Sequence, residues 1–336
     1  MDSLGFVRYT RLAERYFFKT MHLNLPILNQ ISRCKNVLIA GMGGGFDLFC
    51  GLPVYFDLQR HAQQAHLANF SFSNVESLRG GIRLTPTLVG VQAGQDDFSP
   101  YFPELYLAEW FQQRRQESVT IWSFHKTGTR SLLENYRFLV DRLAIDGILL
   151  IDGGVDSLVR GDESQMGTLV EDAISLFVVN QLTQVPVRIM GCLGLTIEYD
   201  VAHNEMLENM AALIKAGGYL GGCSLVPQMP AYQDYADAVF YVHGKRHQDP
   251  SVINSCIISA TQGEFGDHHL TEKTRGSPLA ISPLMALYWF FDLATVAKHN
   301  YILPTLSDTD TFMDTAHVVI EATSALPKRK TPRMSL

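Results

Sequence analysis

Carboxylates gather directly after one apolar stretch of the chain. Residues 147–152 read Gly-Ile-Leu-Leu-Ile-Asp, and Asp152 is soon followed by Asp156 and Glu163. Two carboxylates about 4 Å apart repel by roughly 4 kcal/mol at an effective dielectric constant of about 20. A divalent cation such as Mg²⁺, a cationic group or a shared proton can relieve this repulsion. We therefore predict that Asp152 and Asp156 bind a cation or, together with Glu163, act as catalytic acids and bases.

Three further charged residues are candidates for contacting a substrate. Arg160 lies among the carboxylates, Glu198 follows another apolar run, and Arg275 precedes a Gly-Ser-Pro sequence. Two of them also have a structural interpretation. Arg160 could pair with Glu163 on the surface while Asp156 caps a turn, and Arg275 could simply begin a helix. The residue types alone leave both interpretations open.

A second chemical motif is a glycine-rich loop that follows a short apolar run. Glycine costs roughly 0.5–1 kcal/mol of stability relative to alanine in regular structure. A high density of glycines therefore indicates that the backbone has positive φ or that another group approaches it closely. Unpaired N–H groups at the start of a helix carry partial positive charge and favour anions. Tight packing of the first helix is the structural alternative. We predict that a cofactor or anion contacts the following residues: Gly41, Gly43, Gly44, Gly45, Asp47, Gly153 and Gly154.

The glycine loop departs from three known nucleotide-binding templates. The dinucleotide motif G-x-G-x-x-G requires glycine where the chain has Phe46, and the second apolar run does not end in an acidic residue. No Walker A sequence is present. The loop is similar to the first motif of S-adenosylmethionine methyltransferases, but Ile39 and Ala40 stand where these carry an acid. Binding of NAD or S-adenosylmethionine therefore remains an alternative to the leading interpretation.

Apolar runs alternate with helical patterns over most of the chain, as in βαβ units. The runs are continuously apolar, which predicts strands buried on both faces of a parallel sheet. We predict a Rossmann-like, doubly wound α/β fold, in which the two motifs meet at the carboxyl ends of the strands. The predicted strands are 37–40, 65–72, 119–124, 147–152 and 187–192, and the predicted helices are 11–21, 46–63, 103–116, 130–143, 168–181 and 203–216.

The last third of the chain departs from this alternation. Glycine and proline interrupt residues 217–230, and three apolar helices are predicted near 251–262, 282–298 and 308–326. These helices could form a cap or the interface of a homo-oligomer. We predict one α/β domain over residues 1–336, with a Rossmann-like core at 35–200 and additional C-terminal helices at 217–326.

Composition excludes several classes of protein. Of the 336 residues, 46% are hydrophobic and 18% charged, which supports a large core and argues against disorder. The net charge of −7 provides no basic field for nucleic acid. Glycine and proline interrupt the longest uncharged windows, so no membrane span is expected. Five cysteines without a C-x-x-C pair fit free thiols in a reducing compartment, and we expect a cytoplasmic protein.

Three motifs in this order resemble a family catalogued as a domain of unknown function (number eleven fifty-two). They are Gly41-Met-Gly-Gly-Gly-Phe-Asp47, then Asp152-Gly-Gly-Val-Asp156 with Arg160-Gly-Asp162-Glu163, and finally Gly217-Gly-Tyr-Leu-Gly-Gly222. The resemblance covers about residues 35–326 and implies a Rossmann-like fold. It implies no activity and no catalytic residues.

The residues favour a hydrolase or group-transfer enzyme that binds a small anionic metabolite or a nucleotide between the two motifs. The incomplete dinucleotide motif and the abundance of carboxylates are the basis for this hypothesis. The sequence does not identify a cofactor; a divalent cation such as Mg²⁺ and a nucleotide are the two candidates. A non-catalytic nucleotide sensor or scaffold is the alternative from another functional class.

Overall fold

A computed structural model describes residues 26–61, 63–95 and 100–330, and places their nine strands in one mixed sheet. The order across the sheet is β3-β4-β5-β2-β1-β6-β7-β9-β8. The five central strands, from β5 to β7, run parallel, whereas both edges of the sheet pair antiparallel. The bounds are β1 Asn36–Gly41, β2 Gln64–Phe70, β3 Ile82–Thr85, β4 Leu88–Val91, β5 Ile121–Phe124, β6 Gly147–Gly153, β7 Val187–Leu193, β8 Tyr219–Ser224 and β9 Leu287–Asp292.

The predicted parallel α/β core is confirmed, and the reason for its continuous apolarity is visible in β1. Val37 and Ile39 pack into the hydrophobic core on one face of the sheet. Leu38 and Ala40 pack into a second core on the opposite face. Because successive side chains of a strand point to opposite faces, a strand covered on both sides must be apolar at every position.

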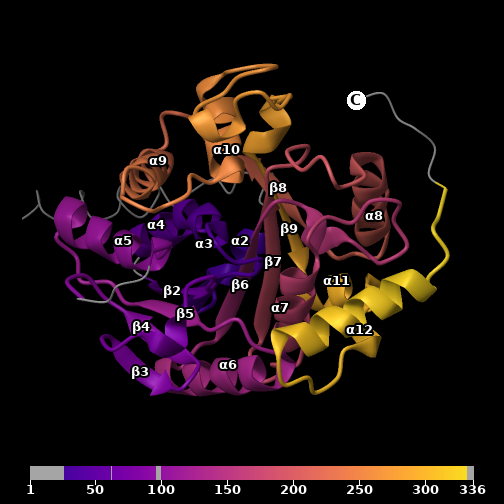
Figure 1. Cartoon of the computed structure of the whole chain (residues 1–336), viewed down its shortest axis with the longest axis horizontal. Coiled ribbons are helices and arrows are strands. Elements are labelled where there is room, and N and C mark those ends of the chain that lie inside the picture. Colours follow the sequence, from indigo (N-terminus) through magenta and orange to yellow (C-terminus); the bar gives the residue numbers. More distant parts are fainter. Residues whose placement is uncertain (1–25, 62, 96–99, 331–336) are drawn as a thin grey trace, which may run out of the picture.

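Helices cover both faces of the sheet (Figure 1). One face carries α2 Pro26–Ile31, α3 Asp47–Cys50, α4 Leu52–Arg60, α5 Pro103–Trp110, α9 Pro230–His243 and α10 Val252–Gln262. The other carries α6 Thr129–Leu143, α7 Val170–Asn180, α8 His203–Lys215, α11 Leu293–His299 and α12 Phe312–Ala325. A π-helical turn, Phe111–Arg115, extends α5. The helix predicted at 11–21 lies outside the described residues.

The helix predicted at 46–63 is divided into α3 and α4 by Gly51. A Cβ atom at Gly51 would lie 2.5 Å from the Cγ2 atom of Ile39 in β1. Only glycine allows the chain to pass this close to the sheet. The break places the short helix α3 directly beside the carboxyl end of β1.

The prediction of a helix over residues 282–298 is wrong for the first part of this range. Residues 283–286 form a short 3₁₀ turn, Leu287–Asp292 is strand β9, and only α11 is an α-helix. β9 pairs antiparallel with both β7 and β8. Tyr288 and Phe290 pack into the core on one face of the sheet, and Phe291 packs into the core on the other face. Residues 287–292 are therefore apolar on both faces, as expected for a buried strand. The strands β3, β4 and β8 and the helix α9 were not predicted.

The sheet and its connections define the position of a crevice. β1 lies between β2 and β6, and the chain leaves β1 toward α3 on one face of the sheet. It leaves β6 toward α7 on the other face. The connections therefore diverge beyond the carboxyl ends of β1 and β6, which is where open α/β sheets bind ligands. No helix in the described part of the chain is long and apolar enough to cross a membrane.

Candidate functional site

A cavity of about 430 Å³ lies beyond the carboxyl ends of β1 and β6. The glycine loop forms one wall and the end of β6 another, while the starts of α7 and α10 complete it. The predicted convergence of the two motifs therefore occurs in the structure. The lining residues are Gly43, Gly44, Gly45, Phe46, Asp47, Phe72, Tyr101, Asp152, Gly153, Asp156, Thr168, Asp172, Glu198, Asp249, Ser251, Val252, Ile253 and Lys273.

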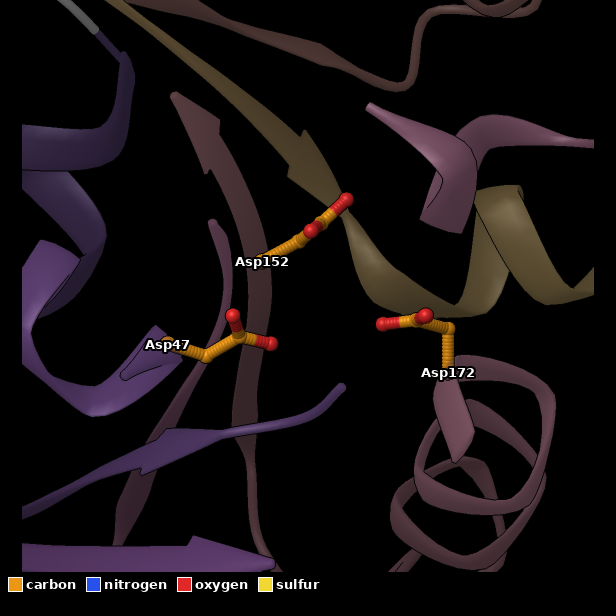
Figure 2. Close-up of side chains that lie close together, drawn as sticks. All are labelled: Asp47, Asp152 and Asp172. Carbon is orange, nitrogen blue, oxygen red and sulfur yellow. The ribbon is translucent and has the colours of Figure 1, made fainter. Parts of the chain in front are cut away.

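Three aspartates form the centre of this site. Asp47 is the first residue of α3, Asp152 stands near the end of β6, and Asp172 lies in the first turn of α7. One carboxylate oxygen from each lies within 4.8 Å of the other two. Figure 2 shows the three side chains pointing into a common space from three separate elements. We call these three residues the aspartate triad.

Asp172 was missed by sequence reasoning, although helical periodicity carries a signal for it. In the helical pattern, Asp172 shares one face with Leu169, Ala173 and Leu176, all of which are buried. An aspartate on the apolar face of a helix requires a polar partner or a ligand. Asp172 is only 4% exposed.

The members of the triad differ in the hydrogen bonds that they accept. Asp47 accepts a bond of 2.6 Å from the N–H of Gly43, and Asp152 accepts one of 3.2 Å from the N–H of Ser157. Within the described residues, Asp172 Oδ1 is buried and has no hydrogen-bond partner. An unsatisfied buried polar group costs roughly 1–3 kcal/mol, and more when it is charged. A hydrogen-bond donor or a cation beside Asp172 Oδ1 would remove this cost.

Two more carboxylates line the same cavity. Asp156 accepts hydrogen bonds from the N–H of Thr168, at 3.0 Å, and from its hydroxyl group, at 3.3 Å. Glu198 accepts one of 2.8 Å from the N–H of Val155. Both residues were predicted from the sequence as site residues, and the structure brings them to the triad.

The paired glycines after β6 make room for this density of carboxylates. A Cβ atom at Gly153 would lie 2.8 Å from Asp47 Oδ1, and one at Gly154 would lie 2.7 Å from Glu198 Oε2. In the first loop, Gly44 and Gly45 have φ values of 93° and 57°, which favour glycine. The two motifs are therefore glycine-rich partly because carboxylates and backbone approach each other closely there.

Burial and mutual repulsion raise the pKa of every carboxyl group in this cluster. Burial, reinforced by the charges of Asp156 and Glu171, raises the pKa of Asp47 to about 8. Burial raises the pKa of Asp156 to about 6, against the hydrogen bonds from Thr168. Burial and neighbouring carboxylates hold the pKa values of three others well above their ordinary range: Asp152, Asp172 and Glu198.

Two lysines near the cavity are paired with acids outside the triad. Lys273 lines the cavity but forms an ion pair with Asp249. Lys126 forms an ion pair of 2.5 Å with Glu171, the residue before Asp172. Among the described residues, no ion pair joins a lysine, arginine or histidine to the triad. Cationic side chains of the described residues therefore do not neutralise the triad when its carboxyl groups ionise.

Three residues predicted from the sequence do not reach the cavity. Glu163 is fully buried elsewhere, where it accepts hydrogen bonds from the N–H groups of Arg160 and Gly161 and pairs with Arg329 at 3.0 Å. Arg160 contacts the ring of Tyr301 and pairs with Asp162. Arg275 is exposed and pairs with Glu272. The contacts of Glu163 and Arg160 join distant segments of the chain, whereas the exposed pair of Arg275 is local.

Two predicted glycines, Gly41 and Gly154, also do not line the cavity. Gly41 ends β1 beneath the glycine loop. A Cβ atom there would lie 2.3 Å from Asn69 Oδ1 and 2.6 Å from the backbone nitrogen of Leu48. Gly41 therefore allows α3 to approach β2 and so supports the loop from below, without lining the cavity itself.

Comparison with known proteins places the chain in a family. Neither the curated proteins nor the solved structures contain a significant match to it. A family model described as "Protein of unknown function (DUF1152)" matches residues 105–325, more than half of the chain. The match includes Asp152, Asp172 and Glu198 but begins after the glycine loop, later than the resemblance from about residue 35 predicted. The chain belongs to the DUF1152 family, whose description assigns no activity.

Proposed function

We propose that the chain is a divalent-cation-dependent hydrolase or group-transfer enzyme that acts on a small anionic metabolite or a nucleotide. Two observations on Asp172 carry this proposal. Its buried Oδ1 atom has no hydrogen-bond partner among the described residues, and one of its carboxylate oxygens lies within 4.8 Å of oxygens of Asp47 and Asp152. A cation bound between the three residues would satisfy this oxygen and neutralise the repulsion among them.

The donor atoms favour a hard cation. All three members of the triad offer carboxylate oxygens, which suit Mg²⁺, Mn²⁺ or Ca²⁺ better than softer metals. Three protein ligands leave coordination positions for water and for oxygens of a substrate, which is the usual arrangement of Mg²⁺ in phosphoryl-transfer sites.

The remaining carboxylates supply groups for acid and base catalysis. A bound divalent cation polarises a phosphoryl or acyl oxygen and lowers the pKa of a coordinated water. Asp156, with a pKa of about 6, is largely ionised at neutral pH and suits a general base. Burial and the neighbouring carboxylates of Asp156 and Asp152 raise the pKa of Glu198 well above its ordinary value, so Glu198 suits a general acid.

The cavity supports a small, anionic substrate. Its volume of about 430 Å³ lies in the usual range of about 300–1,000 Å³ for small-molecule sites. Lys273 lines it together with the first residues of α10, Val252 and Ile253. A bound cation would present positive charge to an anionic group, beside the ion pair that Lys273 forms with Asp249.

The strand order supports a Rossmann-like assignment and a nucleotide as the substrate. The five parallel strands are β1, β2, β5, β6 and β7. Numbered along the chain from 1 to 5, they have the spatial order 3-2-1-4-5, which is the order of the first five strands of the Rossmann sheet. The cavity lies where this order reverses, between β1 and β6. Neither Phe46 nor the neutral Asn69 near the end of β2 matches the dinucleotide pattern, which disfavours NAD.

Free thiols support the cytoplasm as the compartment. All five cysteines are unpaired, and four of them are buried. Unpaired thiols are typical of reducing compartments. We also propose that two or more copies of the chain associate through the C-terminal helices.

Titration calorimetry with MgCl₂ or MnCl₂ at pH 8 tests the cation site. We expect one cation to bind the wild-type protein and Asp152→Asn to weaken its binding by at least about 100-fold, since loss of even an outer-shell partner costs roughly 10- to 100-fold. Glu171→Gln removes the same charge one residue from the triad and should bind within about threefold of wild type. Absence of cation binding to the wild-type protein would refute the site.

A turnover screen tests the reaction class. Nucleotides and phosphorylated metabolites are incubated with Mg²⁺ and the protein, and release or transfer of phosphate is measured. We expect turnover that depends on the cation and is lost in Asp152→Asn. Tight nucleotide binding without turnover would instead support the non-catalytic sensor.

A further inference from the structure

A buried amide beneath the glycine loop makes contacts that the proposed chemistry does not use. Asn69, near the end of β2, is completely buried. Its Nδ2 atom donates one hydrogen bond of 3.0 Å to the carbonyl oxygen of Gly45 and another of 2.9 Å to Oε1 of Glu104. Glu104, from the first turn of α5, is only 1% exposed. A side chain from α5 thus orients the amide that holds the loop.

A second buried amide holds the next peptide of the loop from the opposite direction. Asn254, in the first turn of α10, is 1% exposed. Its Nδ2 atom donates to the carbonyl oxygen of Phe46 at 3.3 Å and to the hydroxyl group of Ser251 at 3.0 Å. Its own carbonyl oxygen accepts a bond of 2.8 Å from the hydroxyl group of Tyr235.

These contacts fix the two peptide groups that immediately precede Asp47. Gly44 and Gly45 both have positive φ, and glycine has the widest range of backbone conformations, so the loop has little rigidity of its own. Because a peptide group is planar, anchoring its carbonyl oxygen also fixes the direction of the following N–H group. The orientation at which Asp47 enters the triad therefore depends on Asn69 and Asn254.

We propose that Asn69, Glu104 and Asn254 are positioning residues that hold Asp47 in the geometry required to bind the cation, an inference that rests on the function proposed above. None of the three lines the cavity. Buried polar groups are often replaceable by apolar residues without loss of stability, so stability alone gives little reason for this set. The need to hold Asp47 in a fixed orientation supplies such a reason. Residues that contact a metal ligand, without binding the metal themselves, orient that ligand.

The hydrogen bond from Asn69 to Oε1 of Glu104 indicates which substitution preserves the role of Glu104. A carboxyl group and a carboxamide have the same shape, and both offer an acceptor oxygen to Asn69. Glu104→Gln should therefore keep the bond, whereas Glu104→Met has similar volume but accepts no comparable bond.

The experiment compares Mn²⁺ affinity and the hydrogen exchange rate of the Gly43 amide in Glu104→Met, Glu104→Gln and a control. The control is Asn135→Leu, which removes an equally buried asparagine that bonds Thr85 and Thr87 far from the cavity. We expect Glu104→Met to weaken Mn²⁺ binding by about 10- to 100-fold and to accelerate exchange of the Gly43 amide. Glu104→Gln should restore both, and Asn135→Leu should change neither.

The two readouts separate the possible failures. Unchanged affinity and unchanged exchange in Glu104→Met would overturn the positioning role. If the wild-type protein binds no Mn²⁺, the proposed function fails, but the exchange rates still decide whether Glu104 and Asn69 hold the loop. If Glu104→Met does not fold, Asn69→Ser replaces it, because serine is too short to maintain the bond to Gly45.

Discussion

Replacing Asp172 by asparagine should stabilise the cation-free protein at alkaline pH, although it removes a candidate ligand. Oxygens of Asp47, Asp152 and Asp172 lie within 4.8 Å of one another. At that distance two full charges repel by about 3.5 kcal/mol at an effective dielectric constant of about 20. Asparagine keeps the shape of the side chain and removes its share of the repulsion.

The sign of the pH dependence follows from the raised pKa values. A carboxyl group whose pKa is higher in the folded protein stabilises the fold at low pH, and this stability is lost as the pH rises through the folded pKa. Burial raises the pKa of Asp47 from 3.8 to about 8. Each pKa unit corresponds to about 1.4 kcal/mol. The ionisation of Asp47 alone can therefore lower the free energy of unfolding by at most about 6 kcal/mol between pH 4 and pH 8.

Urea unfolding in the presence of a chelator, at pH 5, 7 and 9, measures this effect. The wild-type protein should lose several kcal/mol of unfolding free energy between pH 5 and pH 9. Asp172→Asn should equal wild type within about 1 kcal/mol at pH 5 and exceed it by about 3 kcal/mol at pH 9, close to one pairwise repulsion.

Glu171→Gln is the matched control, because its carboxylate already has a partner in Lys126. It should not gain stability at pH 9. The reasoning is refuted if wild-type stability does not fall between pH 5 and pH 9, or if Asp172→Asn follows the wild-type profile.

Three further predictions follow from the same geometry. Cation affinity should rise between pH 6 and pH 8, because Asp47, whose pKa is raised to about 8, must lose its proton to bind the cation; calorimetry in buffers of different ionisation enthalpy would measure the released protons. Gly153→Ala should weaken Mn²⁺ binding at least tenfold, since its Cβ atom would lie 2.8 Å from Asp47 Oδ1, and titration calorimetry would detect this. Glu163→Gln should lower the unfolding free energy by roughly 2–4 kcal/mol, because Glu163 is buried and paired with Arg329, yet leave Mn²⁺ affinity unchanged; a large loss of affinity would place Glu163 in the site after all.

The sequence by itself determined the central sheet and the two motifs. A strand buried on both faces must be apolar throughout, and that pattern is local, so β1 and β6 could be located without knowledge of their neighbours. Asp47, Asp152 and Asp156 were recognised because they stand directly beyond apolar strands or glycines. The general rule that ligands bind at the carboxyl ends of parallel strands then predicted one shared crevice.

The tertiary structure alone decided which carboxylates meet. Asp172 belongs to the site because α7 packs with its acidic first turn toward the crevice, and Glu163 does not because the distant Arg329 pairs with it. Residues 287–292 became a strand because β7 and β8 provide partners on both sides. In each case the deciding contact joins residues far apart in the chain. The local pattern therefore fixes where a carboxylate or a strand stands, whereas packing between elements fixes what it faces.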